Sequence, residues 1–183
     1  QSFKCRDVYG KENHGLLSRD DLRGYRASFE ESVHVDYMGL DVHKCDTWTQ
    51  GPVLLQQLRI LENYDLESLG HNTTEYIHTL MEAAKLAFAD REHYYADPAF
   101  EDVPLDWLLS REYAKKRAEQ IISEASMLQR PGGVEPFMLE ESGAKPFFEG
   151  DTVHIEAVDQ YGNMISATPS GGWLRTSPLI PGR

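Results

Sequence analysis

The sequence is poor in the residue types that mark several classes of protein. Its 183 residues include only two cysteines, Cys5 and Cys45, and neither lies in a CxxC motif or beside a histidine. Two such cysteines make neither a disulfide-rich scaffold nor a cysteine-based zinc site. A bridge between them stays open, and we expect free structural thiols. No apolar run approaches the roughly twenty residues that a transmembrane helix needs, so we predict no membrane span.

Basic residues are also scarce. Lysine and arginine together number 18 against 30 aspartates and glutamates, which gives a formal net charge of -12 at pH 7. Surfaces that bind nucleic-acid phosphates concentrate cations, so we expect no nucleic-acid partner. The first residues lack the charged-then-apolar pattern of a secretory leader, and the chain ends on the turn-rich S-P-L-I-P-G-R. We therefore interpret the sequence as a fragment of a longer protein.

The order of the predicted elements favours an α+β fold, with helices layered on a mostly antiparallel sheet. A short helix within 15–26 and a β-hairpin over 32–45 open the chain. Periodicity then predicts three helices, a long loop rich in glycine and proline, and a second hairpin. These segments are 51–63, 73–95 and 110–125 for the helices, 126–151 for the loop, and 153–158 with 164–168 for the hairpin.

Several helix signals predict particular contacts. Ser18 before Asp20 and Asp21 suits an N-cap followed by acidic residues at the positive end of the helix dipole. Asn72, three residues before Glu75, predicts a capping box. Helical spacing places Leu54, Leu55, Leu58 and Leu61 on one stripe, and a second set keeps the same spacing: Tyr76, Ile77, Leu80, Ala84 and Phe88. Asp90 and Arg91 suit an ion-pair network within the fold.

Thr152 follows the loop and opens the second hairpin. A threonine hydroxyl is a weak nucleophile unless a base takes its proton. If Thr152 became the first residue of a chain, its α-amine would serve, since a free α-amine titrates at roughly 7.7–8.0. Its hydroxyl would first attack the carbonyl of Asp151 and split the chain through an ester. The plainer interpretation is a packed, β-branched strand residue.

The run T-V-H-I-E-A-V-D-Q-Y-G-N-M-I-S-A-T, residues 152–168, resembles the start of the small subunit of γ-glutamyltransferases (glutathione hydrolases). Upstream segments resemble the large subunit of the same family, in order and without large gaps. They include L-L-S-R-D-D-L-R-G-Y, Q-G-P-V-L-L-Q-Q-L-R-I-L-E-N-Y-D-L, L-G-H-N-T-T-E-Y, E-A-A-K-L-A-F-A-D-R and D-P-A-F-E-D-V-P. The resemblance therefore covers nearly the whole chain.

This resemblance implies an N-terminal-nucleophile (Ntn) hydrolase, an αββα sandwich made as a precursor that cleaves itself. Residues 1–151 would be the C-terminal part of the large subunit and 152–183 the start of the small subunit, and the two would form a heterodimer. Thr152 would be the nucleophile, and Asp151 the residue before the cleavage site. A γ-glutamyl donor such as glutathione would acylate Thr152, and water or an amine would accept the acyl group.

The sequence departs from the family's pattern after the second strand. Where the family has T-x-T-x-N, this chain has T-P-S-G-G. Ser170 therefore takes the place of the hydroxyl that supports the nucleophile, and Gly172 that of the asparagine that contacts the donor. T-P-S-G-G-W is more similar to acylase-like members. We keep open an acylase acting on another amide, such as a glutaryl or β-lactam side chain or a poly-γ-glutamate.

Two further candidates have structural alternatives. His154 shares a strand face with Thr152 by the alternation of side chains and could orient the site or act as a structural histidine. Gly171 and Gly172 could present N–H groups to substrate, or form a tight turn. The family's donor-binding arginine and its oxyanion-hole glycine pair have no counterpart in the chain. We therefore expect the fragment alone to be nearly inactive.

The remaining expectations concern metals, location and an alternative class. His34 and His43, on opposite arms of the first hairpin, could pair as ligands, although solvent-facing positions are the simpler interpretation. We predict no metal and no cofactor. The resemblance implies a periplasmic or extracellular protein and leaves the cytoplasm open. A non-catalytic, uncleaved scaffold is the alternative from another class.

Overall fold

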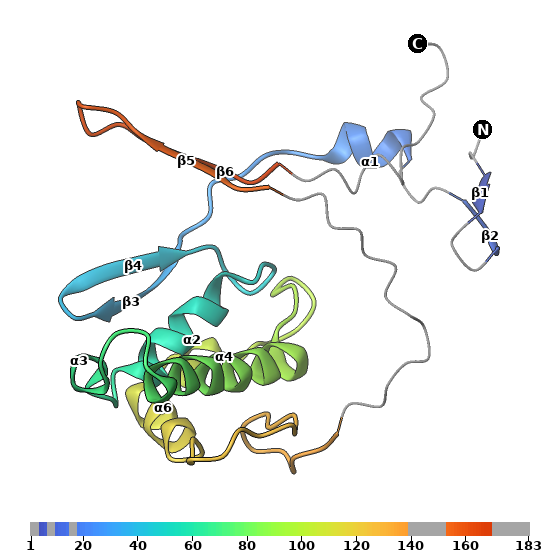
Figure 1. The fold of residues 1–183 in the computed structure, drawn as a ribbon. Coiled ribbons are helices and arrows are strands. Elements are labelled where there is room, and N and C mark those ends of the chain that lie inside the picture. Colours follow the sequence, from blue (N-terminus) through green and yellow to red (C-terminus); the bar gives the residue numbers. More distant parts are fainter. Residues whose placement is uncertain (1–3, 7–9, 15–17, 139–152, 170–183) are drawn as a thin grey trace. The chain divides into compact units, whose positions relative to one another are not determined.

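Two compact units make up the structure, a computed structural model that describes residues 4–6, 10–14, 18–138 and 153–169. The helical unit, residues 28–141, contains β3 (Val33–Tyr37), β4 (Leu40–Lys44), α2 (Gly51–Leu61), α3 (Leu66–Leu69), α4 (Thr74–Tyr94), α5 (Leu105–Leu108) and α6 (Arg111–Ala118) (Figure 1). The terminal unit, residues 1–27 and 142–183, contains β1 (Lys4–Arg6), β2 (Glu12–His14), α1 (Arg19–Gly24), β5 (Ile155–Val158) and β6 (Met164–Ala167).

These units do not coincide with the predicted division between residues 151 and 152. That division is a break in the covalent chain, whereas the units are defined by packing, so the predicted subunit boundary stays a prediction.

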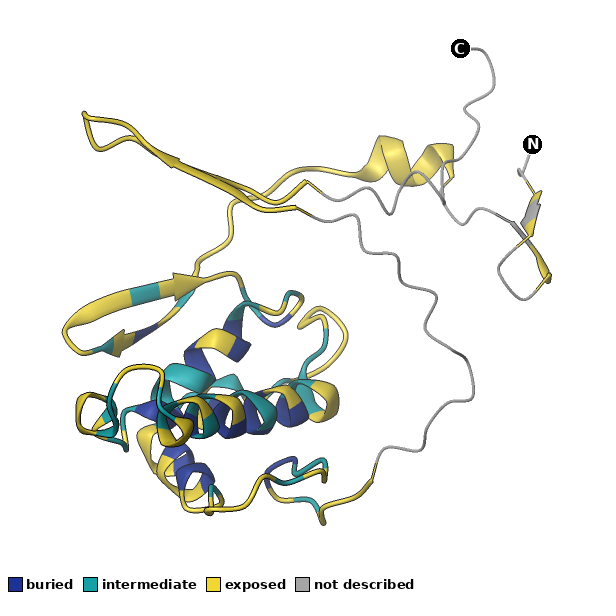
Figure 2. Ribbon diagram, viewed as in Figure 1, coloured by how far each residue is buried: buried dark blue, intermediate teal, exposed yellow. Residues whose placement is uncertain are grey.

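Helices α2, α4 and α6 enclose the core of the helical unit. α2 packs against both of the others, and the buried positions lie on the facing sides of the helices (Figure 2). The central cluster consists of Ile60, Leu61, Ala83, Leu86, Ala114 and Ala118. Its alanines allow the helix backbones to approach closely, while each large aliphatic side chain contributes about 1.5–3 kcal/mol through burial.

The predicted hairpin over 32–45 is confirmed as β3 and β4. Met38 and Gly39 form its two-residue turn with φ of 52° and 80°, the left-handed conformation that tight hairpin turns require. Val35, 1% exposed, lies on the face that packs toward α2. One face of the hairpin is therefore buried, as its alternating sequence predicts.

The predicted helices 51–63 and 73–95 are confirmed, but only some of the apolar residues with helical spacing face the core. Leu55 and Leu61 are buried on α2, whereas Leu54 is 40% exposed. On α4, Leu80 packs against the core, whereas Ile77 and Phe88 are 46% and 40% exposed. The buried face of α4 consists instead of Thr79, Glu82, Ala83, Leu86, Ala87, Ala89 and Asp90. Apolar periodicity does not identify this face because two of its residues are acids. An acid can be buried only where partners brought close by the tertiary structure compensate its charge.

Of the two predicted helix caps, one is confirmed and the other is wrong. Ser18 caps α1 in a capping box, in which its hydroxyl accepts the Asp21 N–H at 3.1 Å and Asp21 accepts the Ser18 N–H at 2.7 Å. α4 is capped by Thr73, whose hydroxyl accepts the Tyr76 N–H at 3.2 Å. Asn72 is not the cap: its φ of 62° places it in the turn before the helix.

The predicted helix over 110–125 is too long, because α6 ends at Ala118. Residues 119–138, which we call the strap, then run beside α4. Side chains of α4 bind backbone carbonyls of the strap, with His78 contacting Ile122 O at 2.7 Å and Lys85 donating to Ser126 O at 2.7 Å. These contacts replace the helical hydrogen bonds of a longer α6. Of the predicted loop over 126–151, the structure describes the part up to residue 138.

Candidate active-site hairpin

The β5–β6 hairpin carries the described part of the predicted site. Its antiparallel register pairs Ile155 with Ala167 and Val158 with Met164. The ladder extends beyond the strands, because Val153 N donates to Pro169 O at 3.0 Å. This confirms the predicted hairpin.

A compact turn closes the hairpin. Asp159 accepts hydrogen bonds from the side chain of Asn163 at 2.8 Å and from the backbone N–H groups of Asn163 and Tyr161 at 3.0 and 2.8 Å. These bonds, the Asn163 side chain first, lower the pKa of Asp159 below its usual value because they favour the ionised carboxylate. The turn therefore sets the pairing of the two strands.

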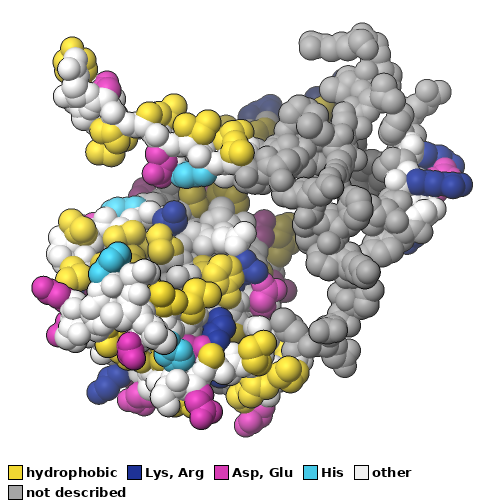
Figure 3. All heavy atoms as spheres, viewed as in Figure 1, with side chains coloured by type: hydrophobic (Ala, Val, Ile, Leu, Met, Phe, Trp, Pro, Cys, Tyr) yellow, Lys and Arg dark blue, Asp and Glu magenta, His cyan; other side chains and the backbone are white. Residues whose placement is uncertain are grey.

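The two faces of the hairpin differ in polarity. One face carries Val153, Ile155, Ala157, Ile165 and Ala167, and the other carries His154, Glu156, Val158, Met164, Ser166 and Thr168. All of these residues are exposed, and hydrophobic side chains stand open along the hairpin (Figure 3). A lone two-stranded hairpin is only marginally stable in water, so we expect further strands of the whole protein to pair with its edges and another layer to cover its apolar face.

His154 makes two contacts on the polar face. Its Nδ1 lies 2.7 Å from the Thr168 hydroxyl on the opposite strand, and its Nε2 lies 2.9 Å from Oε1 of Glu156 on its own strand. A hydroxyl, an imidazole and a carboxylate thus form one hydrogen-bonded chain. Sequence reasoning identified His154 but missed Glu156 and Thr168. Strand alternation offered a signal for Glu156, and the register of the turn offered one for Thr168.

The other predicted site residues lie outside the described part of the chain: Asp151, Thr152, Ser170, Gly171 and Gly172. The structure does describe two of their neighbours in the chain. Val153, which follows Thr152, and Pro169, which precedes Ser170, are the two residues joined by the last described hydrogen bond of the ladder.

A buried acid holds the strap against α4. Asp90 is fully buried and accepts hydrogen bonds from Gln56, the Tyr113 hydroxyl and the Gly132 N–H at 2.8–3.0 Å, with Arg117 at 3.2 Å. Burial raises the pKa of Asp90, and the Arg117 charge and these donors offset that effect only in part. The predicted ion-pair role of Asp90 is confirmed, and it ties α2, α6 and the strap to α4.

Gly132 fits this arrangement because it lacks a side chain. A Cβ there would lie 1.9 Å from the Tyr113 hydroxyl, so no other residue fits without displacing the tyrosine. A second buried acid, Glu82, binds Arg130 of the strap at 2.6 Å. Burial alone would raise the pKa of Glu82, but Lys85 and Arg130 outweigh it and lower the pKa. The strap is therefore anchored at two nearby residues, 130 and 132.

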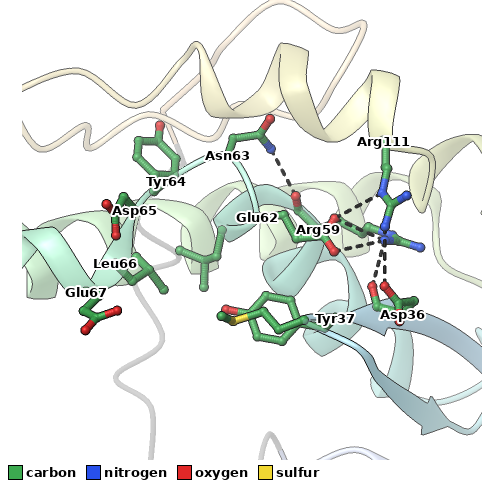
Figure 4. Close-up of a pocket in the computed structure, with 12 residues that line it drawn as sticks. Asp36, Tyr37, Arg59, Glu62, Asn63, Tyr64, Asp65, Leu66, Glu67 and Arg111 are labelled. Carbon is green, nitrogen blue, oxygen red and sulfur yellow. Dashed lines mark hydrogen bonds and ion pairs between the residues drawn. The ribbon is translucent and has the colours of Figure 1, made fainter.

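The residues that line a cavity of about 580 Å³ in the helical unit include no described residue of the predicted site. Arg59, Glu62 and Arg111 line it together with the β3–β4 turn (Figure 4). Arg59 donates to Asp36 O at 2.9 Å and contacts Glu62 at 3.1 Å, and Arg111 reaches Glu62 at 3.5 Å. These charges are paired with one another, so the arrangement serves the fold.

His34 and His43 are direct cross-strand partners, with stacked rings whose centroids lie 4.9 Å apart. In the part of the chain that the structure describes, no group of three or more His, Cys, Asp or Glu side chains is placed to hold a metal ion. Cys45 is an exposed free thiol. No helix within the described ranges combines the length and apolarity needed to cross a membrane.

Helices followed by an antiparallel hairpin, with a threonine directly before that hairpin, are features of the Ntn-hydrolase class, and similarity to solved structures confirms this α+β fold. The chain belongs to the gamma-glutamyltranspeptidase family, whose model matches residues 8–181. The predicted family is thereby confirmed.

Relatives with two different activities match the chain almost equally well. The Acylase ACY 1 proenzyme of Pseudomonas sp. (strain SE83) is 35% identical over 95% of this chain and 30% of its own length. The Glutathione hydrolase proenzyme of Escherichia coli (strain K12) is 35% identical over 86% of this chain and 26% of its own length. The chain thus spans between a quarter and a third of these relatives.

Solved structures are also similar to this chain. LmbA2991T421A superposes with a TM-score of 0.79 at 38% identity, over 98% of this chain and 32% of that one. The cephalosporin acylase from Bacillus halodurans superposes with a TM-score of 0.63 at 32% identity, over 83% of this chain and 25% of that one.

Proposed function

We propose that the whole protein is a self-processing γ-glutamyl acyltransferase or hydrolase in which Thr152 is the nucleophile. Three observations support this. The chain belongs to a family of acyl-transferring enzymes, and the curated relatives it matches are named as proenzymes. Thr152 stands directly before the antiparallel hairpin, after a segment rich in glycine and proline. Its position carries the proposal.

The first step is self-cleavage. The Thr152 hydroxyl oxygen attacks the carbonyl carbon of Asp151, the C–N bond between the two residues breaks as the hydroxyl proton passes to the Thr152 nitrogen, and an ester replaces the amide. Water then hydrolyses the ester, which restores the hydroxyl and leaves Asp151 with a carboxylate. The products are a chain ending at residue 151 and a chain beginning at 152, which remain together as a heterodimer of large and small subunits.

The second step is acyl transfer by the mature enzyme. The free α-amine of Thr152 takes the hydroxyl proton, and the oxygen attacks the γ-glutamyl carbonyl of a donor such as glutathione. The proton passes to the departing amine, and water or an acceptor amine then releases the γ-glutamyl group. Ser170, which stands in the sequence where the family has a supporting hydroxyl, takes that role.

The test uses the full-length protein with Thr152→Ala. The variant should remain one uncleaved chain and should not turn over γ-glutamyl-p-nitroanilide. Thr152→Ser is the matched control, because it keeps a hydroxyl, and it should still cleave. Mass spectrometry and amino-terminal sequencing measure both results. Cleavage and turnover by the alanine variant would show that the nucleophile lies elsewhere.

An acylase for another amide is the second candidate. Gly172 cannot contribute the side chain with which the family's asparagine contacts the donor, and acylase relatives match as well as glutathione hydrolases. Comparing kcat/KM for glutathione, a glutaryl amide and poly-γ-glutamate separates these activities. For the scaffold alternative, the expected observation is a single intact mass after days at neutral pH.

A further inference from the structure

Two exposed imidazoles face each other across the β3–β4 hairpin. His34 and His43 occupy directly opposite positions, and their rings stack with centroids 4.9 Å apart and an angle of 22° between the planes. Side chains at such positions have Cβ atoms about 4.5–5.5 Å apart. A zinc ion binds imidazole nitrogen at about 2.0–2.1 Å, so two nitrogens on one ion lie roughly 3–3.5 Å apart. Rotation of the exposed rings about their side-chain bonds therefore brings one nitrogen of each within reach of the same ion.

The fold does not use this pair for packing. The buried face of the hairpin is the opposite one, where Val35 packs toward α2. Among the residues that the structure describes, the His34 ring stacks on His43 and makes no hydrogen bond or ion pair. Both ring nitrogens of His34 are therefore available to a ligand.

Ser32 orients the second ring. Its hydroxyl oxygen lies 2.9 Å from Nδ1 of His43. A histidine that binds a metal commonly donates the N–H of its other ring nitrogen to an oxygen, which fixes the tautomer. With Nδ1–H donating to the Ser32 hydroxyl, the lone pair of His43 lies on Nε2, the nitrogen that we assign to the ion.

The charge beside the pair favours a cation. Asp36 and Asp41 are the next cross-strand partners on the same face of the hairpin, two residues along each strand from the histidines. Asp36 contacts Arg111 at 3.6 Å, whereas Asp41 makes no ion pair among the described residues. The Asp41 carboxylate therefore adds negative potential to this face, and no described cation offsets it.

We propose that His34 and His43 bind a divalent late transition-metal ion such as Zn²⁺, with water in its remaining coordination positions. Imidazole suits Zn²⁺, Ni²⁺ and Cu²⁺, whereas Mg²⁺ and Ca²⁺ prefer oxygen ligands. In the described ranges no third His, Cys, Asp or Glu joins the pair in a group that could hold the ion, so we expect an exchangeable ion. By joining β3 to β4, the ion stabilises the folded hairpin to which it binds. The site goes beyond the proposed function, because none of its residues takes part in acyl transfer.

Zinc titration of the full-length protein, first stripped of metal with a chelator, tests the proposal. Isothermal titration calorimetry should find one zinc site in the wild type that is missing from His34→Gln and from His43→Gln. His71→Gln, a change to an exposed histidine elsewhere in the helical unit, is the matched control and should keep that site. Ser32→Ala should weaken zinc binding about 10-fold, because it removes the oxygen that fixes the tautomer. Mg²⁺ should produce no comparable heat.

NMR and thermal melting separate metal binding from a structural effect of the substitutions. Imidazole signals of His34 and His43 should shift together as one zinc ion is added, with the larger shift of His43 at Nε2. Zn²⁺ should raise the Tm of the wild type and of His71→Gln more than that of His34→Gln. Circular dichroism without metal checks that every variant is folded, as expected for exposed side chains.

The proposal is overturned if His34→Gln binds as many zinc ions as the wild type with the same affinity, or if zinc shifts the signals of only one of the two rings. Failure of the proposed function looks different, because it concerns cleavage and turnover. Thr152→Ala should bind zinc at this site as the wild type does, whatever its effect on cleavage.

Discussion

At the scale of single residues, the buried ion pair between Asp90 and Arg117 links α4, α6 and the strap. Both side chains are almost completely buried, and Arg117 also donates to the carbonyl oxygens of Leu86 and Arg130 at 3.0 and 2.5 Å. Neither charge can exchange its partner for water. Removing one partner of such a pair leaves a buried charge without compensation.

We predict that Arg117→Met lowers the free energy of unfolding by about 3–5 kcal/mol. Arg111→Met, the same substitution on the same helix, should cost no more than about 1 kcal/mol, because that arginine is exposed and its contacts are long. Denaturant titration of the two full-length variants measures the difference. Equal losses would contradict the importance of the buried pair.

Two tyrosines of the helical unit, the half-buried Tyr95 and the buried Tyr113, make stability depend on alkaline pH. Burial first, and then the charge of Asp90, raise the pKa of Tyr95 and Tyr113 above the ordinary value of 10.0. The folded state therefore retains protons that the unfolded chain would release. This contribution is complete below pH 10, and it is lost as the pH rises above 10 toward the raised folded-state pKa values.

We therefore predict that Tyr95→Phe makes stability fall less steeply above pH 10, because the proton that Tyr95 retains in the folded state is gone. Tyr25→Phe, at a tyrosine that is 74% exposed, is the control and should keep the wild-type slope. Unfolding free energies measured at several alkaline pH values give both slopes. An unchanged slope for Tyr95→Phe would contradict the prediction.

At the scale of elements, substitutions at the start of α4 test whether Thr73 rather than Asn72 is its N-cap. Thr73→Ala should destabilise the helix by about 1 kcal/mol, because it removes the hydroxyl that accepts the Tyr76 N–H. Asn72→Gly should be neutral or slightly stabilising, since glycine adopts a φ of 62° without steric cost. Thermal melting and hydrogen exchange over α4 measure both. A larger loss for Asn72→Gly would favour the capping box that the sequence predicts.

The elements also show why the pattern of apolar residues does not identify the buried face of α4. The exposed Ile77 and Phe88 of α4 follow helical spacing as well as its buried residues do, so apolar periodicity alone could not choose between the faces. The true face includes Glu82 and Asp90, which pair with Arg130 and Arg117, and Glu82 also pairs with Lys85 of the same helix. The two arginines come from the strap and α6, between 27 and 48 residues away along the chain.

At the scale of the whole molecule, the two units differ in how much of their apolar surface is covered. The helical unit buries its own core, whereas the β5–β6 hairpin exposes both faces. We predict slow amide hydrogen exchange for α2, α4 and α6 in the 183-residue chain, and fast exchange for the hairpin. The hairpin should become protected in the full-length protein, where further strands can pair with it. Slow exchange of the hairpin in the short chain would contradict this.

The sequence by itself determined the family, the order of helices and hairpins, and the candidate nucleophile, because these depend on local patterns and on ordered motifs along the chain. It also determined the Ser18 cap, since capping involves neighbours in sequence. Only the tertiary structure decided which face of α4 is buried, where α6 ends, and which groups hold His154. Burial of a charge and the orientation of an imidazole depend on partners brought together by packing and strand register, and spacing along the chain does not specify them.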